Sequence, residues 1–377
     1  MSSPQDGVAG LLQGASERQA AGGDSGGRGR DRKPGRGLII AIVAFVFVVI
    51  VGAIGFASAG LFGGGSKDYT GPGHGAVVIS VKPGDSLTVI GQTLQAAGVV
   101  KTTQAFIDAA SANPKSTLVA PGSYRMALQM SGALALNTLL NPAARVSHVV
   151  VIPEGTRTAG VVLIASKVTG ISVAAFEKAL SRPATLGLPA WGHHHAEGFL
   201  FPATYSIDPG MSATNVLRRM TARFQQSSVA LNLPAEAARM GRTPYQVLIV
   251  ASIIQREVAP RDYAKAARVI YNRLDKGMKL ELDSTVAYGL GISRLNLTAA
   301  DLSSQTPYNT YVINGLPPTP IGNPGDAALT AALHPASGNW IYFVTVNLNT
   351  QETRFSSTYA QFLRDKQAFL DWQASHS

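Results

Sequence analysis

The chain has 377 residues, enough for about two domains of ~150 residues each, and 46% of them are apolar, which can supply a real core. It contains no cysteine, which excludes disulfides, thiolate nucleophiles and cysteine–zinc sites. The formal net charge of +10 suits nucleic acid, anionic lipid or an acidic polymer, but no recognition helix, zinc-finger spacing or aromatic RNA-binding motif is present, so we expect no nucleic-acid partner.

The first 75 residues predict a leader, a membrane span and a linker. Residues 1–37 are rich in Gly, Ala, Ser and Arg, and we expect them to be disordered. Residues 38–57 predict a transmembrane helix, because positions 38–56 carry no charge and would span about 28 Å as a helix. Residues 58–75 form a Gly-rich linker.

The basic cluster at 28–36 sets the expected orientation of this span. By the positive-inside rule the N-terminus lies in the cytoplasm and the rest of this single-pass membrane protein lies outside. A cleaved signal peptide is the alternative, because "ASA" at 57–59 resembles a cleavage site. The apolar stretch is longer than the usual ~7–15 residues of a signal peptide, which favours a retained anchor.

Residues 76–145 predict a small α+β module. A strand over 76–81 is followed by a turn and by a helix for which Asp85 is the expected cap. Another strand is expected over 119–126. Residues 146–373 then predict a larger α+β domain, so the fold class is α+β throughout. Its clearest elements are helices over 244–258, 261–277 and 357–373 and strands over 278–282 and 339–347.

The helix over 244–258 ends in an unusual glutamate, Glu257. Ile253 and Ile254 share its face by the i−4 and i−3 spacings, so the carboxyl group is expected at the edge of the core. Desolvation and the helix C-terminus both raise the pKa of such a group. A glutamate that stays protonated near neutral pH can act as a general acid. The alternative is a helix-end glutamate paired with Arg256 or Arg261.

Further candidates follow the same helix. Asp283, Thr285 and Tyr288 come after the strand over 278–282 and are expected at the mouth of the same cleft, although an aspartate there is commonly a helix N-cap. Gln255 cannot exchange a proton usefully, but it could orient a substrate; otherwise it is a half-buried amide.

Two loops carry the remaining candidates. Glu197 opens the aromatic stretch 197–205, and a carboxylate beside aromatic rings suits sugar binding, although core aromatics and a turn explain it equally. Asn309 lies on the proline-stiffened loop 306–325 and could hold a sugar acetamide or simply form a turn. The histidines at 193–195 do not predict a metal site, because consecutive side chains point apart and no HExxH motif exists.

Long stretches of this chain resemble one family. The motifs are EGFLFPATY, ASIIQREV, ARVIYNRLDKGMKLELDSTVAYGLG and PYNTYVINGLPPTPIGNPGDAALTAALHPA. They are similar to those of the endolytic murein transglycosylase family (MltG or YceG-like), in the same order, over roughly 146–370. The module at 76–145 resembles the LysM-like subdomain that precedes the catalytic domain in this family.

The resemblance implies a reaction and a single catalytic residue. The family cleaves the β-1,4 bond between N-acetylmuramic acid and N-acetylglucosamine in nascent peptidoglycan strands and leaves 1,6-anhydromuramyl ends without using water. Its acid and base fall on Glu257 here. No metal or nucleotide cofactor is implied, and enzymes that polymerise and crosslink the glycan are the expected partners. The chain departs from the usual family pattern at Gln255, Glu281 and Ser284.

Two other functions remain open from the sequence. One is a membrane-anchored scaffold that binds the cell wall without catalysis. The other is a hydrolase that uses Glu257 together with Asp283, because ordinary glycosidases place two carboxyl groups around the bond.

Overall fold

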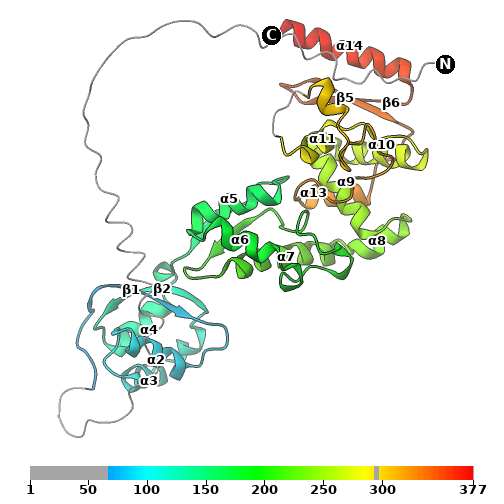
Figure 1. Ribbon diagram of the computed structural model, residues 1–377. Helices are drawn as coiled ribbons and strands as arrows, with labels where there is room; N and C mark the ends of the chain where they lie inside the picture. Colours follow the sequence, from blue (N-terminus) through cyan, green and yellow to red (C-terminus); the bar gives the residue numbers. More distant parts are fainter. Residues whose placement is uncertain (1–66, 293–296, 377) are drawn as a thin grey trace, which may run out of the picture. The chain divides into compact units, whose positions relative to one another are not determined.

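The computed structural model describes residues 67–292 and 297–376 (Figure 1). These residues divide into two compact units, with the boundary between His148 and Val149. The short segment Asp208–Gly210 belongs with the N-terminal unit. Helices and small sheets occur in both units, so the α+β expectation is confirmed.

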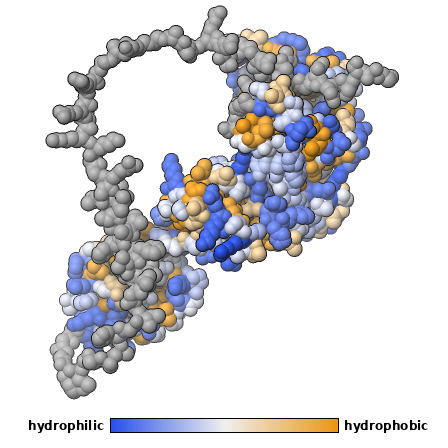
Figure 2. Space-filling model, in the orientation of Figure 1, coloured by the Kyte–Doolittle hydropathy of each residue, from blue (hydrophilic) through white to orange (hydrophobic). Residues whose placement is uncertain are grey.

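The membrane-span prediction falls outside the part of the chain that the structure describes. The leader, the apolar segment 38–57 and the first part of the linker all lie before residue 67. Within 67–292 and 297–376, none of the helices combines the length and the apolar character needed to cross a bilayer. Figure 2 shows hydrophilic residues over much of the visible face, with hydrophobic residues in scattered groups between them.

The N-terminal unit is built on an antiparallel strand pair. Its elements are β1 (His74–Val81), α2 (Leu87–Ala96), α3 (Thr103–Ser111), β2 (Gly122–Leu128) and α4 (Gly132–Leu140), with 3-10 turns at Pro114–Leu118 and Pro142–Ala144. Ile79 pairs with Tyr124 in the strand register, and both side chains are buried. The alternation along β1 leaves Val78 exposed, as expected for a strand with one covered face.

The turn before α2 corrects one sequence expectation. Ser86, not Asp85, caps the helix, because its hydroxyl accepts a hydrogen bond from Val89 N. The carboxylate of Asp85 instead accepts a 2.7 Å hydrogen bond from Lys82 N and closes the preceding turn. Both residue types are good N-caps, and only the register of the turn decides between them.

The C-terminal unit is mainly helical. Its helices are α5 (Thr158–Thr169), α6 (Val173–Leu180), α7 (Ala213–Ala230), α8 (Leu233–Arg239), α9 (Pro244–Glu257), α10 (Tyr263–Asp275), α11 (Asp283–Gly289), α12 (Ala299–Leu302), α13 (Asp326–Leu333) and α14 (Tyr359–Ser375). Its strands are β3 (His148–Val151), β4 (Thr204–Ile207), β5 (Tyr342–Asn347) and β6 (Glu352–Ser356), and 3-10 turns occur at Pro183–Thr185, Ala190–Gly192 and Pro260–Asp262. Strands β3 and β4 pair with each other, β5 pairs antiparallel with β6, and α14 lies along β5 (Figure 1).

Helix α9 is the central element of this unit. Every residue from Val247 to Ile254 is buried, as expected for a helix that is apolar on all sides. A capping box between Thr243 and Gln246 fixes its start, and α8, α10 and α13 pack around it. The helix ends at Glu257. Because the helix is fixed by the packing around it, the position of this glutamate is fixed as well.

The predicted strand over 278–282 is wrong. Leu280 and Leu282 are buried as the alternation suggested, but Glu281 has a positive φ of 52°, which a strand does not allow. The guanidinium of Arg273 donates hydrogen bonds to the carbonyls of Lys279 and Leu280, at 2.8 and 3.0 Å. Arg273 and Thr310 therefore satisfy backbone groups that a partner strand would otherwise bind.

Candidate active site

The carboxyl group of Glu257 meets the first turn of α11. Its Oε1 accepts a hydrogen bond of 3.3 Å from the backbone N–H of Ser284. The last turn of α9 and the first turn of α11 are thus joined through this glutamate, although 27 residues separate the two partners. The Glu257 side chain is half-buried at this junction.

The surroundings of Glu257 favour its protonated form. Burial raises the pKa of Glu257 from the ordinary 4.5 to about 7, and the neighbouring Asp283 carboxylate pushes it in the same direction. Hydrogen bonding by Ser284 and the positive charge of Arg256 lower this pKa but do not offset the burial. A carboxyl group with a pKa near 7 can release and recover a proton at neutral pH.

The alternative of an ion pair at the end of α9 is not formed among the described residues. Arg256 Nη1 donates to the carbonyl of Gly155 at 3.4 Å. Arg261 pairs with Asp262 at 3.5 Å and donates to the carbonyl of Thr350 at 2.7 Å. Both guanidinium groups are therefore anchored to other atoms, and Glu257 keeps its carboxyl group available.

Asp283 lies beside Glu257 but does not act as a helix cap. It is the first residue of α11, and Leu282 takes the cap position. Its Oδ1 accepts a hydrogen bond of 2.7 Å from the hydroxyl of Tyr311. Burial raises the pKa of Asp283, whereas the Tyr311 hydrogen bond lowers it. The carboxylate is thus held by one donor, which leaves acceptor capacity on its other oxygen.

Thr285 and Asn309 lie in the interior of the protein, below Glu257 and Asp283. Both have an exposed fraction of 0%. The Thr285 hydroxyl contacts the Leu282 carbonyl at 2.6 Å, and Asn309 Nδ2 donates to the carbonyls of Leu302 and Ser304, both at 2.8 Å. The expectation that Asn309 holds a sugar acetamide does not fit this placement, because its amide is already used inside the protein.

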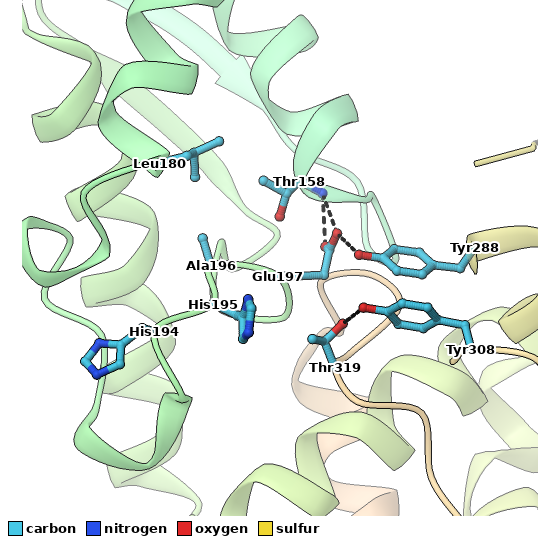
Figure 3. Close-up of a pocket in the computed structure, with 9 residues that line it drawn as sticks. All are labelled: Thr158, Leu180, His194, His195, Ala196, Glu197, Tyr288, Tyr308 and Thr319. Atoms are coloured by element: carbon cyan, nitrogen blue, oxygen red, sulfur yellow. Dashed lines mark hydrogen bonds between the residues drawn. The ribbon is translucent and has the colours of Figure 1, made fainter. Parts of the chain in front are cut away.

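Glu197 and Tyr288 meet one turn further along α11. Glu197 accepts hydrogen bonds from Tyr288 Oη at 2.9 Å and from Thr158 N at 3.0 Å (Figure 3). It also accepts one from Asn323 Nδ2 at 3.3 Å. Burial raises the pKa of Glu197, and these hydrogen bonds counteract the shift. The carboxyl group therefore ties together three segments around the site, a role for which its sequence context held no signal.

A cavity of about 290 Å³ opens beside this pair of residues. The rings of Tyr288 and Tyr308 lie 4.9 Å apart on one side of it, and Tyr308 shares a 2.8 Å hydrogen bond with Thr319 (Figure 3). The lining residues are Thr158, Leu180, His194, His195, Ala196, Glu197, Tyr288, Tyr308 and Thr319. Aromatic rings beside hydroxyl and carboxyl groups form a surface that suits a sugar ring.

Gln255 is used as an internal brace. Its Nε2 contacts the hydroxyl of Tyr263 at 2.5 Å, and its Oε1 accepts a hydrogen bond of 3.1 Å from Gly325 N. The amide thus joins α9 to the start of α10 and to the loop before α13. The predicted substrate contact of Gln255 would require one of these bonds to break.

The three consecutive histidines do not gather around a metal position. His193 contacts the ring of Tyr245 edge-on at 4.6 Å, whereas His194 and His195 line the cavity. Across residues 67–292 and 297–376, no cluster of three or more histidine, aspartate or glutamate side chains has an arrangement that could hold a metal ion.

Sequence reasoning missed two residues of this site. Tyr311 holds Asp283, and Arg157 lies over the Tyr288 ring at 5.1 Å from its centroid. Tyr311 lies on the same proline-stiffened loop 306–325 as Asn309, so its aromatic hydroxyl was the available signal. Arg157 follows a proline–glycine turn and carried no comparable signal.

Comparisons with known proteins point to one family. A family model described as the YceG-like family matches residues 79–368. The chain is similar to an endolytic murein transglycosylase of Bacillus subtilis (strain 168), with 35% identity over 179 residues that cover 47% of this chain and 49% of that protein. It is also similar to one of Streptococcus pneumoniae serotype 2, with 27% identity over 299 residues that cover 71% of this chain and 54% of that protein. The chain thus spans about half the length of the curated relatives that it matches.

A solved structure supports the fold. The crystal structure of a yceG-like protein from Listeria monocytogenes aligns with a TM-score of 0.53 and 27% sequence identity. The alignment covers 77% of this chain and 99% of the Listeria chain.

Proposed function

Because the chain belongs to the YceG-like family, we propose that it is an endolytic lytic transglycosylase of peptidoglycan. Its substrate would be the β-1,4 bond between N-acetylmuramic acid and N-acetylglucosamine within a glycan strand, and its product a 1,6-anhydromuramyl end. Two relatives that bear the name endolytic murein transglycosylase support this proposal.

The observation that carries the proposal is the environment of Glu257. This carboxyl group ends a helix whose middle is fully buried, and its pKa is raised to about 7. A single group that is half protonated near neutral pH can serve first as an acid and then as a base. Asp283 stands beside it, and its carboxylate charge also raises the pKa of Glu257.

The proposed reaction balances without water. The protonated Glu257 gives its proton to the glycosidic oxygen as the bond from this oxygen to C1 of the muramyl ring breaks. The glucosamine end leaves as an alcohol. The resulting carboxylate then takes the proton of the C6 hydroxyl of the same muramyl ring, and O6 forms the new bond to C1. Glu257 ends protonated, as it began.

Asp283 has a place in this scheme as an electrostatic partner. The muramyl C1 gains positive charge when its bond to the leaving oxygen breaks. An anionic group that is already oriented stabilises such charge without reorganising during the reaction. The hydroxyl of Tyr311 holds the Asp283 carboxylate in one orientation.

The wider setting is proposed from the sequence. Residues 38–57 would anchor the chain in the cell membrane with its C-terminal part outside, and residues 76–145 would form a LysM-like module that binds glycan. The strand pair β1–β2 with its packed helices supports a compact module of this size. Peptidoglycan synthases would be partners, because the enzyme would act on newly made strands beside the membrane.

Product analysis tests the proposal directly. Purified glycan strands are digested with the full-length chain, and the fragments are weighed by mass spectrometry. Anhydro ends, with no added mass of water, are the expected result. Fragments that have gained a water molecule would instead show a hydrolase that uses Glu257 with Asp283. Strands that stay intact but are bound would show the non-catalytic cell-wall scaffold.

A further inference from the structure

Two arginines converge on the glutamates of the site from different elements. Arg256 precedes Glu257 on α9 and reaches the carbonyl of Gly155 at 3.4 Å. Arg157 stands two residues after Gly155, just before α5, and its guanidinium lies over the Tyr288 ring. The loop at 155–157 therefore brings both cations to the same side of the site.

Neither arginine makes a direct contact with a carboxylate of the described chain. Within residues 67–292 and 297–376, neither guanidinium forms an ion pair. Arg157 Nη2 donates only to the carbonyl of Ile292, at 3.1 Å. Glu197 attracts Arg157 electrostatically, but its oxygens accept hydrogen bonds from Thr158, Tyr288 and Asn323. Arg157 and Arg256 are thus fixed by backbone oxygens, while Glu197 and Glu257 act on them only through longer-range attraction.

Each guanidinium donates to one backbone carbonyl, which leaves further N–H groups for an anion. Burial and then the charge of Arg256 lower the pKa of Arg157, whereas Tyr288 and Glu197 raise it. Arg157 is half-buried and Arg256 is exposed, so an anion can reach both side chains from the solvent. A bound anion would use the planar donor groups of both side chains.

Helix α11 gives the distance from this pair to the proposed reaction centre. Ser284, which contacts Glu257, and Tyr288, which lies under Arg157, are four residues apart on one face of the helix. This spacing corresponds to ~6 Å along the helix. An anion at the arginines would therefore sit about one sugar ring away from the bond that is cleaved.

We infer that Arg157 and Arg256 together bind a carboxylate carried by the muramyl residue of the glycan strand. The inference rests on the proposed function, because the muramyl ring is the sugar whose C1 lies at Glu257. This ring carries a lactyl group on O3, which ends in a carboxylate when free and continues into the acidic peptide stem when substituted. Guanidinium groups bind carboxylates through paired, charge-assisted hydrogen bonds.

Ligand binding to an inactive chain tests the inference. The full-length chain with Glu257→Gln is titrated with three ligands that separate the possible sources of the anion. These are glycan strands with peptide stems, strands stripped of stems by an amidase, which leaves the lactyl carboxylate, and chitin oligosaccharides, which have no lactyl group.

Arg157→Gln and Arg256→Gln should each weaken binding to a muramyl ligand about tenfold and leave chitin binding unchanged. A loss with stem-bearing strands places the anion on the peptide, whereas a loss with stripped strands places it on the lactyl group. Arg157→Lys and Arg256→Lys keep the charge but lose the planar fork, so a smaller loss is expected. Arg218→Gln, at an exposed position of α7, is the matched control and should change nothing.

The inference is overturned if both glutamine variants bind every muramyl ligand normally, or if they lose chitin binding to the same extent. If a glutamine variant unfolds early in a thermal melt, the chain with both arginines intact is tested instead. Added salt must then weaken its binding to muramyl ligands and leave chitin binding unchanged. These binding results are independent of product formation. A chain that binds as expected but makes no anhydro ends disproves the proposed function and leaves the arginine site standing.

Discussion

The backbone N–H of Ser284 donates a 3.3 Å hydrogen bond to the Glu257 carboxyl group. The first turn of α11 is therefore held against the last turn of α9. Because α11 also carries Asp283 and Tyr288, one short helix connects the proposed acid–base residue to its acidic neighbour and to the Glu197 network.

Glu257→Gln should abolish bond cleavage while the chain still binds glycan. The amide has nearly the same shape but cannot carry the proton, so a loss of at least ~10²-fold in the rate of anhydro-product formation is expected. Quantified fragments from timed digests provide the measurement. Glu177→Gln, an exposed change on α6, serves as the control and should cleave like the unmodified chain. Full activity in Glu257→Gln would remove this residue from the mechanism.

Asp283→Asn should shift the alkaline limb of the pH profile to lower pH. The Asp283 charge raises the pKa of Glu257, so its removal lowers that pKa and the acid form is lost earlier as pH rises. A shift of one unit would reduce activity on the alkaline side about tenfold. The pH dependence of kcat/KM is the measurement.

Arg256→Gln should shift the alkaline limb of the pH profile in the opposite direction. The Arg256 charge lowers the pKa of Glu257, so its loss should move the same limb to higher pH. Identical profiles for the Asp283 and Arg256 variants would show that neither charge acts on Glu257.

The stability of the C-terminal unit should depend on pH through Glu257. Its pKa is about 7 when folded and near 4.5 when unfolded, so between these values the unfolded chain binds fewer protons. Stability is therefore unaffected below pH ~4.5 and falls as pH rises toward 7, by at most ~3 kcal/mol for a half-buried group.

Urea unfolding at pH 4.5 and 7.5 measures this effect. The glutamine variant at position 257 does not titrate, so its gain in the free energy of unfolding over the unmodified chain should be larger at pH 7.5. Glu177→Gln is again the matched control, because its glutamate is exposed. A gain that is equal at both pH values would argue against a raised pKa.

Asn309→Ala should destabilise the chain instead of weakening substrate binding. Its side chain connects the carbonyls of Leu302 and Ser304 with Tyr311 N, and it is fully buried. Leaving these groups unpaired should lower the free energy of unfolding by at least ~2 kcal/mol. Chemical denaturation compares it with Asn349→Ala, an exposed control. A stable variant with a raised KM would restore the substrate-contact interpretation.

Gly198→Ala should be more harmful than an alanine at another left-handed glycine. A Cβ at Gly198 would lie 2.6 Å from Pro320 Cγ and 3.1 Å from Leu248 Cδ2, at a φ of +91°. Gly187 also has a positive φ, +69°, but a Cβ there meets nothing within 4 Å. The difference in unfolding free energy isolates the packing term, expected at ~1–3 kcal/mol. Equal losses of unfolding free energy in the two variants would mean that the loop beside Glu197 adjusts to the added methyl group at no cost.

Part of this architecture was predictable because it depends on local periodicity. The apolar run from Val247 to Ile254 indicated a buried helix, and the structure places α9 over nearly the predicted range. The same pattern put Glu257 at the edge of the core. Alternation failed over 278–282, because Leu280 and Leu282 can turn inward on an irregular chain when a side chain such as Arg273 binds its carbonyls.

The sequence by itself determined the α+β class, the helix that ends in Glu257 and the family resemblance, since each depends on residue order along one element or motif. Only the tertiary structure decided that Ser284 and Asp283 face Glu257, that Asn309 is buried, and that Arg256 contacts the loop before Arg157. These contacts join residues that are far apart in the chain. Residue type alone does not determine whether a polar side chain is satisfied inside the fold or left free at its surface.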